Sequence, residues 1–390
     1  MVMLQSEPIP ADDADPSTQL RASLPGRYYT DPAQFTLDQE AVFARSWLCV
    51  ARSEDVAQRS GFLRLTAAGR DVIVVRGSNG VLRGFHNLCR HRGAALCLEG
   101  SGEFNRAIRC MYHGWAYDLD GRLIATPNAH EMPGLRRQDF GLHRFPVEEW
   151  LGYVWVNLDP AAAPLADQVE MQIRERLGDL ETLARYDVGS LRVGRRIEYD
   201  VASNWKCVVE NFMECYHCAS IHPELTQALP QFASGWGTVS SGTGAGATLA
   251  DGLTGFSMSG RSSRPRLPGL LDSDDRLFFA VILRPNALMI LMPDHVVVFR
   301  LEPLGAARSK VVVDWLFTAA ETEREGFDPS DSVELLDVTN RQDFDACQRC
   351  QIGMMSPEYR GVLVPSEHVV IDFHDYYLRL LGEAESTLAS

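Results

Sequence analysis

The chain has 390 residues, of which 45% are hydrophobic and 23% are charged, and its formal net charge is -15. This length predicts two domains, and the composition is that of an ordinary globular protein. The negative charge argues against nucleic acid as a partner, because binding to phosphates depends on clustered Lys and Arg.

No stretch of the sequence approaches the ~20 consecutive apolar residues that span a bilayer. The N-terminal seven residues lack the basic region and apolar core of a secretory signal. We therefore expect no membrane partner and a cytoplasmic location. The nine cysteines do not indicate a disulfide framework, which is a feature of short secreted domains.

Residues 1–35 are expected to form a flexible N-terminal tail, since the first twenty contain three prolines and four acidic residues beside few large apolar ones. A helix is predicted from Thr36, as N-cap with Gln39 at the capping-box position, to Trp47. From there to residue 160 the sequence predicts short strands separated by turns, a pattern typical of an all-β domain. The strands are expected at residues 61–66, 71–76, 81–85, 107–109, 117–121 and 150–157.

Two pairs of metal-binding side chains lie on loops between these strands. Cys89 and His91 form a C-x-H pair, and Cys110 and His113 form a C-x2-H pair, with eighteen residues between the pairs. In a mixed-ligand 2Fe-2S cluster two Cys bind one iron and two His bind the other, which raises the reduction potential. Cys2His2 is also a tetrahedral zinc set, but zinc fingers usually pair Cys with Cys and His with His. The pairing of unlike residues favours the iron-sulfur cluster and therefore an electron relay.

The second half of the chain, residues 161–380, mixes helices and strands and predicts an α+β fold. Helices are expected at residues 165–185 and 205–221 and again from Ser330. Residues 233–268 are rich in Gly and Ser and predict a long loop, either a lid or disordered. Strong strands are expected at residues 278–283, 287–292, 295–301 and 310–317.

A second group of chemically active residues surrounds His217 and His222. On an ideal helix these two positions point about 140° apart, so the helix must end or bulge for both imidazoles to reach one ion. Pro223 supplies a reason, because the residue before a proline is driven out of the helical conformation. Two neutral imidazoles suit a divalent transition metal, and one carboxylate would complete the facial triad of non-heme Fe(II) oxygenases.

Both groups of residues resemble motifs of the Rieske non-heme iron oxygenases. The sequences CRHRG at 89–93 and CMYHGW at 110–115 resemble the Rieske fingerprint. Residues 210–222 resemble the family motif E-N-x2-E-x-Y-H-x4-H, which holds the mononuclear iron. The resemblance extends over nearly everything from residue 40 to residue 375.

The resemblance implies roles for the residues of the second motif. His217 and His222 would bind the mononuclear Fe(II), and Glu214 would be the carboxylate that hydrogen-bonds a Rieske histidine. Asn211 and Tyr216 would line the iron pocket.

A third ligand is implied further along the chain, as an acidic residue eight positions before a Gln on a late helix. Asp343, eight residues before Gln351, matches this position. Asp345 is the rival ligand, and Asp337 is a more distant alternative. From the residues alone the choice stays open, because this region contains several carboxylates.

The family also implies the domain organisation and the partners. It implies a Rieske 2Fe-2S domain at residues 36–160 and a helix-grip catalytic domain with an antiparallel sheet at residues 161–380. Such a terminal oxygenase activates O2 with electrons that come from NAD(P)H through a separate flavin or iron-sulfur reductase. It further implies a homotrimer, in which the cluster of one subunit feeds the iron of its neighbour through Glu214.

The sequence ECYHC at 214–218 is most like the branch of the family that acts on quaternary ammonium compounds. This likeness implies oxidative N-demethylation of a betaine-type small molecule with release of formaldehyde. A pocket for such a cation needs aromatic faces. By sequence position, the aromatic candidates are Tyr216, Trp236, Phe256 and Phe344.

Two alternatives remain open from the sequence. Hydroxylation or dihydroxylation of an aromatic acid would require an arginine for the substrate carboxylate, and Arg261 or Arg264 in the Gly- and Ser-rich segment would supply it. A Rieske electron-transfer protein without oxygenase activity would leave the two histidines and the acidic residue of the second motif without a role.

Overall fold

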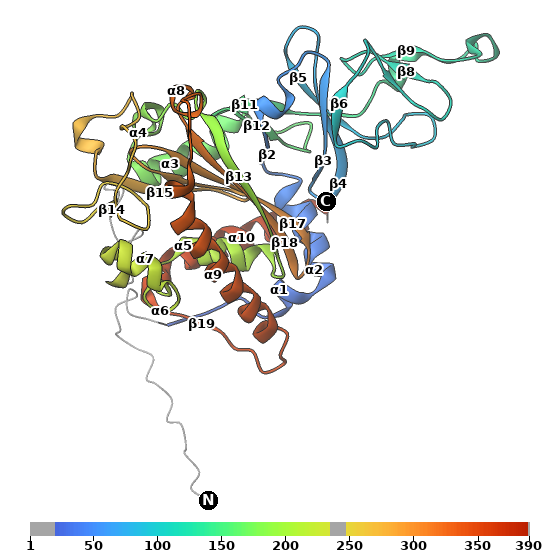
Figure 1. Cartoon of the computed structure of the whole chain (residues 1–390). Helices are drawn as coiled ribbons and strands as arrows, with labels where there is room; N and C mark the ends of the chain where they lie inside the picture. Colours follow the sequence, from blue (N-terminus) through green and yellow to red (C-terminus); the bar gives the residue numbers. More distant parts are fainter. Residues whose placement is uncertain (1–19, 235–246, 389–390) are drawn as a thin grey trace, which may run out of the picture.

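The structure is a computed structural model that describes residues 20–234 and 247–388 (Figure 1). Its N-terminal part is built from small antiparallel sheets, and its C-terminal part is a larger antiparallel sheet covered by helices. The α+β fold expected from the sequence is confirmed. Within the described residues, no helix combines the length and the apolar character that a membrane span requires.

The N-terminal part consists of short strands. They are β2 (Leu48–Arg52), β3 (Gly61–Ala67), β4 (Arg70–Arg76), β5 (Leu82–His86), β6 (Ser101–Glu103), β7 (Ile108–Arg109), β8 (Ala116–Tyr117), β9 (Leu123–Ala125), β10 (Arg144–Phe145), β11 (Val147–Trp150) and β12 (Tyr153–Val156). They form a five-stranded sheet, β10-β5-β4-β3-β6, and two three-stranded sheets, β11-β12-β2 and β7-β8-β9. Residues 118–121, expected to continue a strand, form the turn after β8, and residues 150–157 contain the turn between β11 and β12.

Strand β4 separates two hydrophobic cores. Ile73 and Val75 pack with the side chains around Cys89, whereas Val72 and Val74 pack toward the C-terminal part. This division follows from the two-residue period of a strand, in which neighbouring side chains point to opposite faces. The cysteines of the two Cys-His pairs therefore belong to a hydrophobic core of the N-terminal part.

The sheet of the C-terminal part has six antiparallel strands in the order β13-β18-β17-β16-β15-β14. Four of them were expected from the sequence, and the two outer ones, β13 and β14, were not. Five charged residues and a glycine interrupt the apolar pattern of β13, so its sequence lacks the signal of a buried strand. The strands are β13 (Arg192–Val201), β14 (Ala247–Thr248), β15 (Leu277–Leu283), β16 (Ala287–Leu291), β17 (Val296–Gly305) and β18 (Arg308–Phe317).

Helices cover both faces of this sheet (Figure 1). On one face lie α5 (Trp205–Met213), α9 (Ser330–Met354) and α10 (His368–Leu388), and against the other lie α3 (Leu165–Leu177) and α4 (Leu180–Arg185). Neighbouring residues of β15 divide accordingly, with Phe278 in the first core and Phe279 in the second. Three short helices complete this part, α6 (Cys218–Ile221), α7 (Pro223–Ala228) and α8 (Ala319–Thr322).

Residues 20–35 are ordered in the structure, although a flexible tail was expected there. Strand β1 (Arg21–Ala22) pairs with β19 (Val362–Leu363), and α1 (Arg27–Thr30) packs against α9. Helix α2 (Pro32–Asp38) begins with Asp31 as its N-cap, rather than Thr36, and continues as a π-helical turn at Gln39–Phe43. The expectation was wrong because the partners of this segment lie at the far end of the sequence. Residues 1–19 lie outside the described residues.

A buried ion pair joins this N-terminal segment to the helices of the C-terminal part. Lys206, at the start of α5, and Asp38, at the end of α2, are both fully buried and in direct contact. Trp205 and Tyr377 donate hydrogen bonds to the same carboxylate at 2.9 and 2.6 Å. Their rings also lie beside the ammonium group, with each centroid 4.8 Å from it. The pair therefore holds α2, α5 and α10 together.

Asp38→Asn is expected to destabilise the C-terminal part by about 3–5 kcal/mol, because it leaves the Lys206 ammonium buried without its counter-charge. Asp200→Asn is the control, since it breaks an exposed pair with Arg308 and is expected to cost less than about 1 kcal/mol. Urea unfolding followed by tryptophan fluorescence measures both. Equal losses from the two substitutions would contradict a structural role for the buried pair.

Candidate metal centres

Two loops with the same backbone pattern hold the first set of candidate ligands. Cys89 and His91 lie between β5 and β6, and Cys110 and His113 lie between β7 and β8. In each loop the amide of the glycine four residues after the cysteine donates to the cysteine carbonyl at 3.0 Å. Both glycines have positive φ, 72° and 71°, a conformation that glycine adopts without strain. The two Cys-His pairs thus arise from one kind of turn used twice.

The thiols and the imidazoles of these four residues are separated from each other. Cys89 and Cys110 are buried and in contact with one another. The rings of His91 and His113 lie on the outer side, with centroids 4.5 Å apart, and His91 is exposed. This donor set, with both thiols inside and both imidazoles outside, fits a two-iron cluster in which one iron binds the two cysteines and the other binds the two histidines.

The second set of candidate ligands lies where the helix expected at residues 205–221 is broken. Helix α5 ends at Met213, Glu214 is extended, and α6 begins only after His217. His222 lies between α6 and α7 with φ -116° and ψ 68°. This non-helical conformation before Pro223 was expected from the sequence. It leaves the ring centroids of the two histidines 5.2 Å apart.

One oxygen of Asp343 faces both imidazoles. Its Oδ1 lies 3.2 Å from Nε2 of His217 and 3.0 Å from Nε2 of His222. The side-chain amide of Asn211 donates to the same oxygen at 3.1 Å. Two imidazoles and one carboxylate make up the ligand set of non-heme Fe(II) sites, so the donors present here fit a mononuclear iron.

The two rival carboxylates of α9 have other partners. Asp345 is exposed and pairs with Arg349 at 2.7 Å. Asp337 pairs with Arg341 at 3.1 Å and accepts a hydrogen bond from Tyr199. Of the three acidic residues considered, Asp343 is the one that the structure brings to the histidines.

Glu214 lies on the outer side of His217. Its carboxylate contacts Nδ1 of His217 and accepts the amides of Tyr216 and His217, the latter at 3.3 Å. Burial by itself lowers the pKa of His217, but Asp343 and Glu214 outweigh it and raise the pKa to about 10. The two carboxylates thus create a negative environment that a divalent cation would compensate.

The glutamine of the late-helix motif positions the two helices that form the site. Gln351 lies about two turns after Asp343 on α9. Its Oε1 accepts the amide of Asn204 at 2.8 Å, and its Nε2 donates to the carbonyl of Tyr29 at 3.1 Å. Asn204 is the N-cap of α5, which carries Asn211. Helices α9 and α5 are therefore joined at the start of α5 and again at the contact between Asn211 and Asp343.

A cavity of about 80 Å³ lies beside the two histidines and Asp343. Among the described residues no lysine or arginine lines it, and residues 235–246 contain none. Its lining includes the carboxylates of Glu214 and Asp343. Aromatic faces and negative charge favour a cationic ligand over an anionic one. The aromatic lining consists of Phe212, Phe232, Phe256, Phe278 and Phe299.

The aromatic residues proposed from their sequence position differ in where they lie. Phe256 lines the cavity. Tyr216, expected in the iron pocket, is 61% exposed and lies outside the lining, and Phe344 packs against Tyr199 with ring centroids 5.1 Å apart. Trp236 lies outside the described residues.

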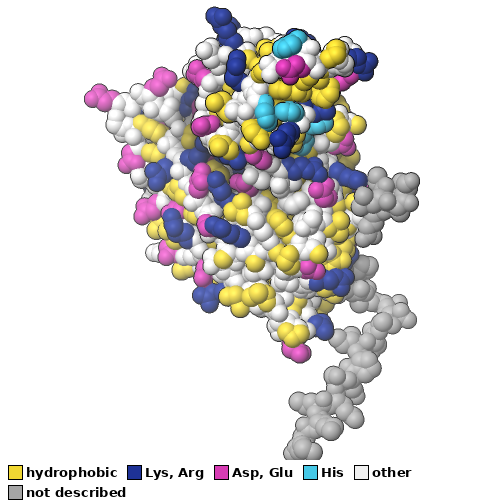
Figure 2. All heavy atoms as spheres, turned by 90° about the vertical axis from the view of Figure 1, so that its right-hand side faces the viewer, with side chains coloured by type: hydrophobic (Ala, Val, Ile, Leu, Met, Phe, Trp, Pro, Cys, Tyr) yellow, Lys and Arg dark blue, Asp and Glu magenta, His cyan; other side chains and the backbone are white. Residues whose placement is uncertain are grey.

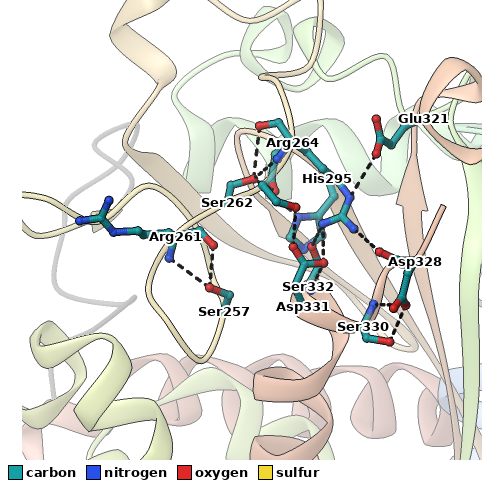
Figure 3. Close-up of polar contacts among 12 residues, drawn as sticks. Ser257, Arg261, Ser262, Arg264, His295, Glu321, Asp328, Ser330, Asp331 and Ser332 are labelled. Atoms are coloured by element: carbon teal, nitrogen blue, oxygen red, sulfur yellow. Dashed lines mark hydrogen bonds and ion pairs between the residues drawn. The ribbon is translucent and has the colours of Figure 1, made fainter. Parts of the chain in front are cut away.

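Neither of the two arginines proposed for an acidic substrate lines the cavity. Arg264 is buried and donates to Asp331 and Ser332 at 2.6 and 2.8 Å (Figure 3). Figure 3 shows the side chain of Arg261 directed away from this cluster, and its main chain bonds to Ser257. Arg264 therefore connects its loop to the start of α9.

Two polar residues near the histidines were not found from the sequence. The side-chain oxygen of Gln342 lies 2.8 Å from Nδ1 of His222, and its amide donates to Glu224 at 2.7 Å. Gln342 directly precedes Asp343, but successive residues of a helix point about 100° apart. Its contact with His222 depends on the packing of α9 against α7, for which the sequence holds no local signal.

Known protein families match both parts of the chain. The Rieske [2Fe-2S] domain matches residues 46–145, which include both Cys-His pairs. The ring hydroxylating alpha subunit (catalytic domain) matches residues 188–383, which include the two histidines and Asp343 of the second site.

Two relatives span most of the chain. The glycine betaine monooxygenase oxygenase subunit of Chromohalobacter salexigens is 31% identical over 392 residues, which cover 91% of this chain and 85% of that protein. The carnitine monooxygenase oxygenase subunit of Acinetobacter pittii is 30% identical over 342 residues, or 87% of each chain.

Solved structures show the same arrangement of domains. The quaternary ammonium Rieske monooxygenase CntA, studied for carnitine oxidation and inter-subunit electron transfer, has a TM-score of 0.72 at 26% identity and covers 93% of this chain and 95% of its own. Naphthalene 1,2-dioxygenase from Rhodococcus shares the fold, with a TM-score of 0.70 at 19% identity over 92% of this chain and 94% of its own.

Asp343→Asn is expected to weaken Fe(II) binding more than about 100-fold, beyond the range for outer partners of metal ligands, because the amide lacks the charge that both imidazoles face. Asp345→Asn, two residues away on the same helix, is expected to bind iron normally. Elemental analysis measures the mononuclear iron, and the visible absorption of the cluster should stay unchanged in both variants. Loss of iron in Asp345→Asn alone would show that Asp343 is the wrong choice.

Proposed function

The chain belongs to the Rieske oxygenases with a ring-hydroxylating type of catalytic domain, and we propose that it demethylates a small quaternary ammonium compound of the betaine type. As a member of this family it is an oxidoreductase, with a Rieske 2Fe-2S cluster and a non-heme iron. One observation carries the choice of substrate. The cavity at the second metal site has aromatic and acidic walls, and among the described residues no lysine or arginine lines it.

We assign the two metal centres to the two sets of residues that the fold brings together. When bound, the mononuclear iron would activate O2 with electrons relayed from the cluster. Asn211 supports this assignment, because its amide holds the oxygen of Asp343 that faces both histidines. The cluster ligands are Cys89, His91, Cys110 and His113, and the iron ligands are His217, His222 and Asp343.

A trimethylammonium group suits the chemistry of the cavity. Its charge is spread over methyl groups, so it is attracted to the faces of phenylalanine rings and requires no hydrogen bonds. The five phenylalanines of the cavity lining form an aromatic wall, in which the rings of Phe212 and Phe299 lie with centroids 5.5 Å apart. An aromatic acid has no cationic group to offset the negative charge of Glu214 and Asp343, whereas a betaine can place its ammonium end there and keep its carboxylate farther away.

The reaction proposed for this site balances with a reductase as partner. One oxygen atom of O2 enters a C–H bond of an N-methyl group, and the other leaves as water after taking up two electrons and two protons. The resulting carbinolamine loses its hydroxyl proton to solvent and breaks its C–N bond, so formaldehyde leaves and the tertiary amine keeps the electron pair. The two electrons come from NAD(P)H through a separate flavin reductase, because the hydride chemistry belongs to such cofactors. Dependence on NAD(P)H fits the cytoplasm, which we propose as the location.

The surface around the cluster loops suits a protein partner. Residues 81–145 contain nine arginines and six acidic residues, a formal charge of +3 in a chain of -15. Next to the cluster ligands, Met111 is 85% exposed and Tyr112 is 58% exposed. Figure 2 faces the N-terminal part and shows histidine, basic and hydrophobic side chains gathered in its upper region. Exposed apolar side chains among charged ones are typical of interaction sites.

We propose a second copy of the chain as the occupant of this surface, within a homotrimer. The cluster loops and helices α6 and α7 lie at opposite ends of the molecule in Figure 1. A head-to-tail ring places a surface of each subunit against a different surface of the next, so the basic cluster loops of one chain can meet the segment that carries Glu214 in its neighbour. The inter-subunit electron transfer studied in CntA supports this arrangement.

With reductase and NAD(P)H, a panel of betaines, carnitine, N-methylated prolines and benzoates is expected to yield formaldehyde from N-methyl compounds and no product from benzoates. Formaldehyde is measured together with O2 uptake. Turnover of benzoates, without formaldehyde from any N-methyl compound, would overturn the substrate proposal. In His217→Ala, substrate-dependent O2 uptake should fall to background, and its survival would indicate an electron-transfer protein.

Glycine betaine and 3,3-dimethylbutanoate test the role of the cation, because they have the same shape and differ in a nitrogen or carbon centre. If the aromatic wall recognises the positive charge, betaine is expected to bind about 2–30-fold more tightly, equivalent to ~0.5–2 kcal/mol. Calorimetric titration measures both affinities. Equal affinities would show that shape alone governs binding.

Mixed trimers test electron transfer between subunits. Cys110→Ser removes the cluster and keeps the iron site, whereas His217→Ala does the reverse. Reassembled together in equal amounts, the two inactive variants are expected to give about a quarter of native activity. About half of the subunits keep the iron site, and about half of those have a donor neighbour that keeps its cluster. Mixed assemblies without activity would contradict transfer between subunits.

A further inference from the structure

The two imidazoles of the iron site have different partners on their outer nitrogens. Nδ1 of His217 contacts the carboxylate of Glu214, whereas Nδ1 of His222 lies 2.8 Å from Oε1 of Gln342. The amide nitrogen of Gln342 donates in turn to Oε2 of Glu224 at 2.7 Å. His222 is 1% exposed, so Gln342 takes the place that water would otherwise occupy at this nitrogen.

Glu224 determines which way the amide of Gln342 points. An ionised carboxylate only accepts hydrogen bonds, so the NH2 end of the amide must face Glu224 and the oxygen must face His222. Because that oxygen only accepts, Nδ1 of His222 carries a proton, and Nε2 is the nitrogen left to offer its lone pair when a metal binds. Nε2 is the atom that faces Asp343 at 3.0 Å. The carboxylate of Glu224 thus determines, through Gln342, which nitrogen of His222 faces the metal.

We propose that Gln342 and Glu224 are positioning residues that fix the tautomer and the ring orientation of His222 for the metal. This inference rests on the iron site of the proposed function and adds two residues that support it from outside. Metal-binding histidines in general depend on such a partner at their second nitrogen.

The backbone explains why His222 needs this support. It belongs to neither of the flanking helices, and its φ and ψ are non-helical. The hydroxyl and the amide of Thr226 each bond to its carbonyl at 3.0 Å. These bonds hold the main chain and do not set the orientation of the ring. Gln342 restrains the ring from α9, the helix that supplies Asp343 as the next residue. One helix therefore provides a ligand and also aligns another ligand.

The test measures Fe(II) affinity without turnover, by anaerobic titration of protein that keeps its cluster after removal of the mononuclear iron. Gln342→Leu removes both hydrogen bonds and is expected to weaken Fe(II) binding about 10–100-fold. Gln348→Leu is the matched control, because it makes the same change on the same helix outside this network. It is expected to bind Fe(II) with native affinity.

Exchange of the two residues provides a sharper test. In Gln342→Glu alone, two carboxylates face each other and iron binding should weaken. In the double variant Glu224→Gln with Gln342→Glu, the amide at position 224 donates to the carboxylate at position 342, which still accepts from His222. This variant is expected to bind Fe(II) at least about tenfold more tightly than Gln342→Leu. The electron paramagnetic resonance spectrum of its ferrous nitric oxide complex should return to the native form.

Native affinity and a native spectrum in Gln342→Leu would overturn the inference, as would an exchanged pair that binds no better than Gln342→Glu. His217→Ala separates this failure from failure of the iron site itself. If His217→Ala keeps native Fe(II) affinity, the proposed iron site is wrong. If it loses iron while Gln342→Leu does not, the site stands and only the positioning role fails. Cluster absorption and thermal unfolding verify that each variant is folded.

Discussion

The convergence of three side chains on one oxygen of Asp343 is the constraint on which the rest of the structure depends. Asn211 comes from α5, the two histidines come from the broken stretch after it, and Asp343 comes from the middle of α9. Asn211 and Asp343 are 132 positions apart in the sequence, so they meet only because both helices pack on the same sheet. A buried carboxylate without partners is costly. The partners of Asp343 are Asn211 and the two histidines, and a metal ion could bind between the histidines and the same oxygen of Asp343.

Buried polar contacts fix α5 on the side that faces away from the cavity. Lys206 pairs with Asp38, and one turn later Glu210 accepts hydrogen bonds from Tyr29 and lies 2.9 Å from Nε2 of His374. Residues i and i+4 share one face of a helix, so these contacts leave another face of α5 to the iron pocket. The N-terminal segment therefore holds the helix that carries Asn211, because Tyr29 of α1 and Asp38 of α2 supply two of the partners of α5.

Sequence reasoning succeeded where chemistry is local and failed where it depends on long-range packing. The Cys-His pairs were predictable because each lies in a tight turn closed by its own glycine, and the break before Pro223 follows from local sterics. The aromatic wall was not predictable, because its phenylalanines come from helices, strands and a loop that are far apart in sequence. Aromatic candidates chosen by position gave Phe256 alone among those described, and Arg264 proved to pair with Asp331, 67 positions away.

The charges around the iron position explain how a cation can approach a metal ion. With the proposed ligands, Fe(II) bound by neutral imidazoles and Asp343 would keep one formal positive charge. A second positive charge about 5 Å away would then be repelled by about 3 kcal/mol at an effective dielectric of 20. Glu214 contacts His217 and lines the same cavity, so the two carboxylates together balance the ion. Gln342, the partner of the other histidine, is neutral and does not disturb this balance. Glu214 lies on the side from which electrons would enter. A quaternary ammonium group bound at the aromatic wall would therefore face an iron site without net charge, which would not repel it.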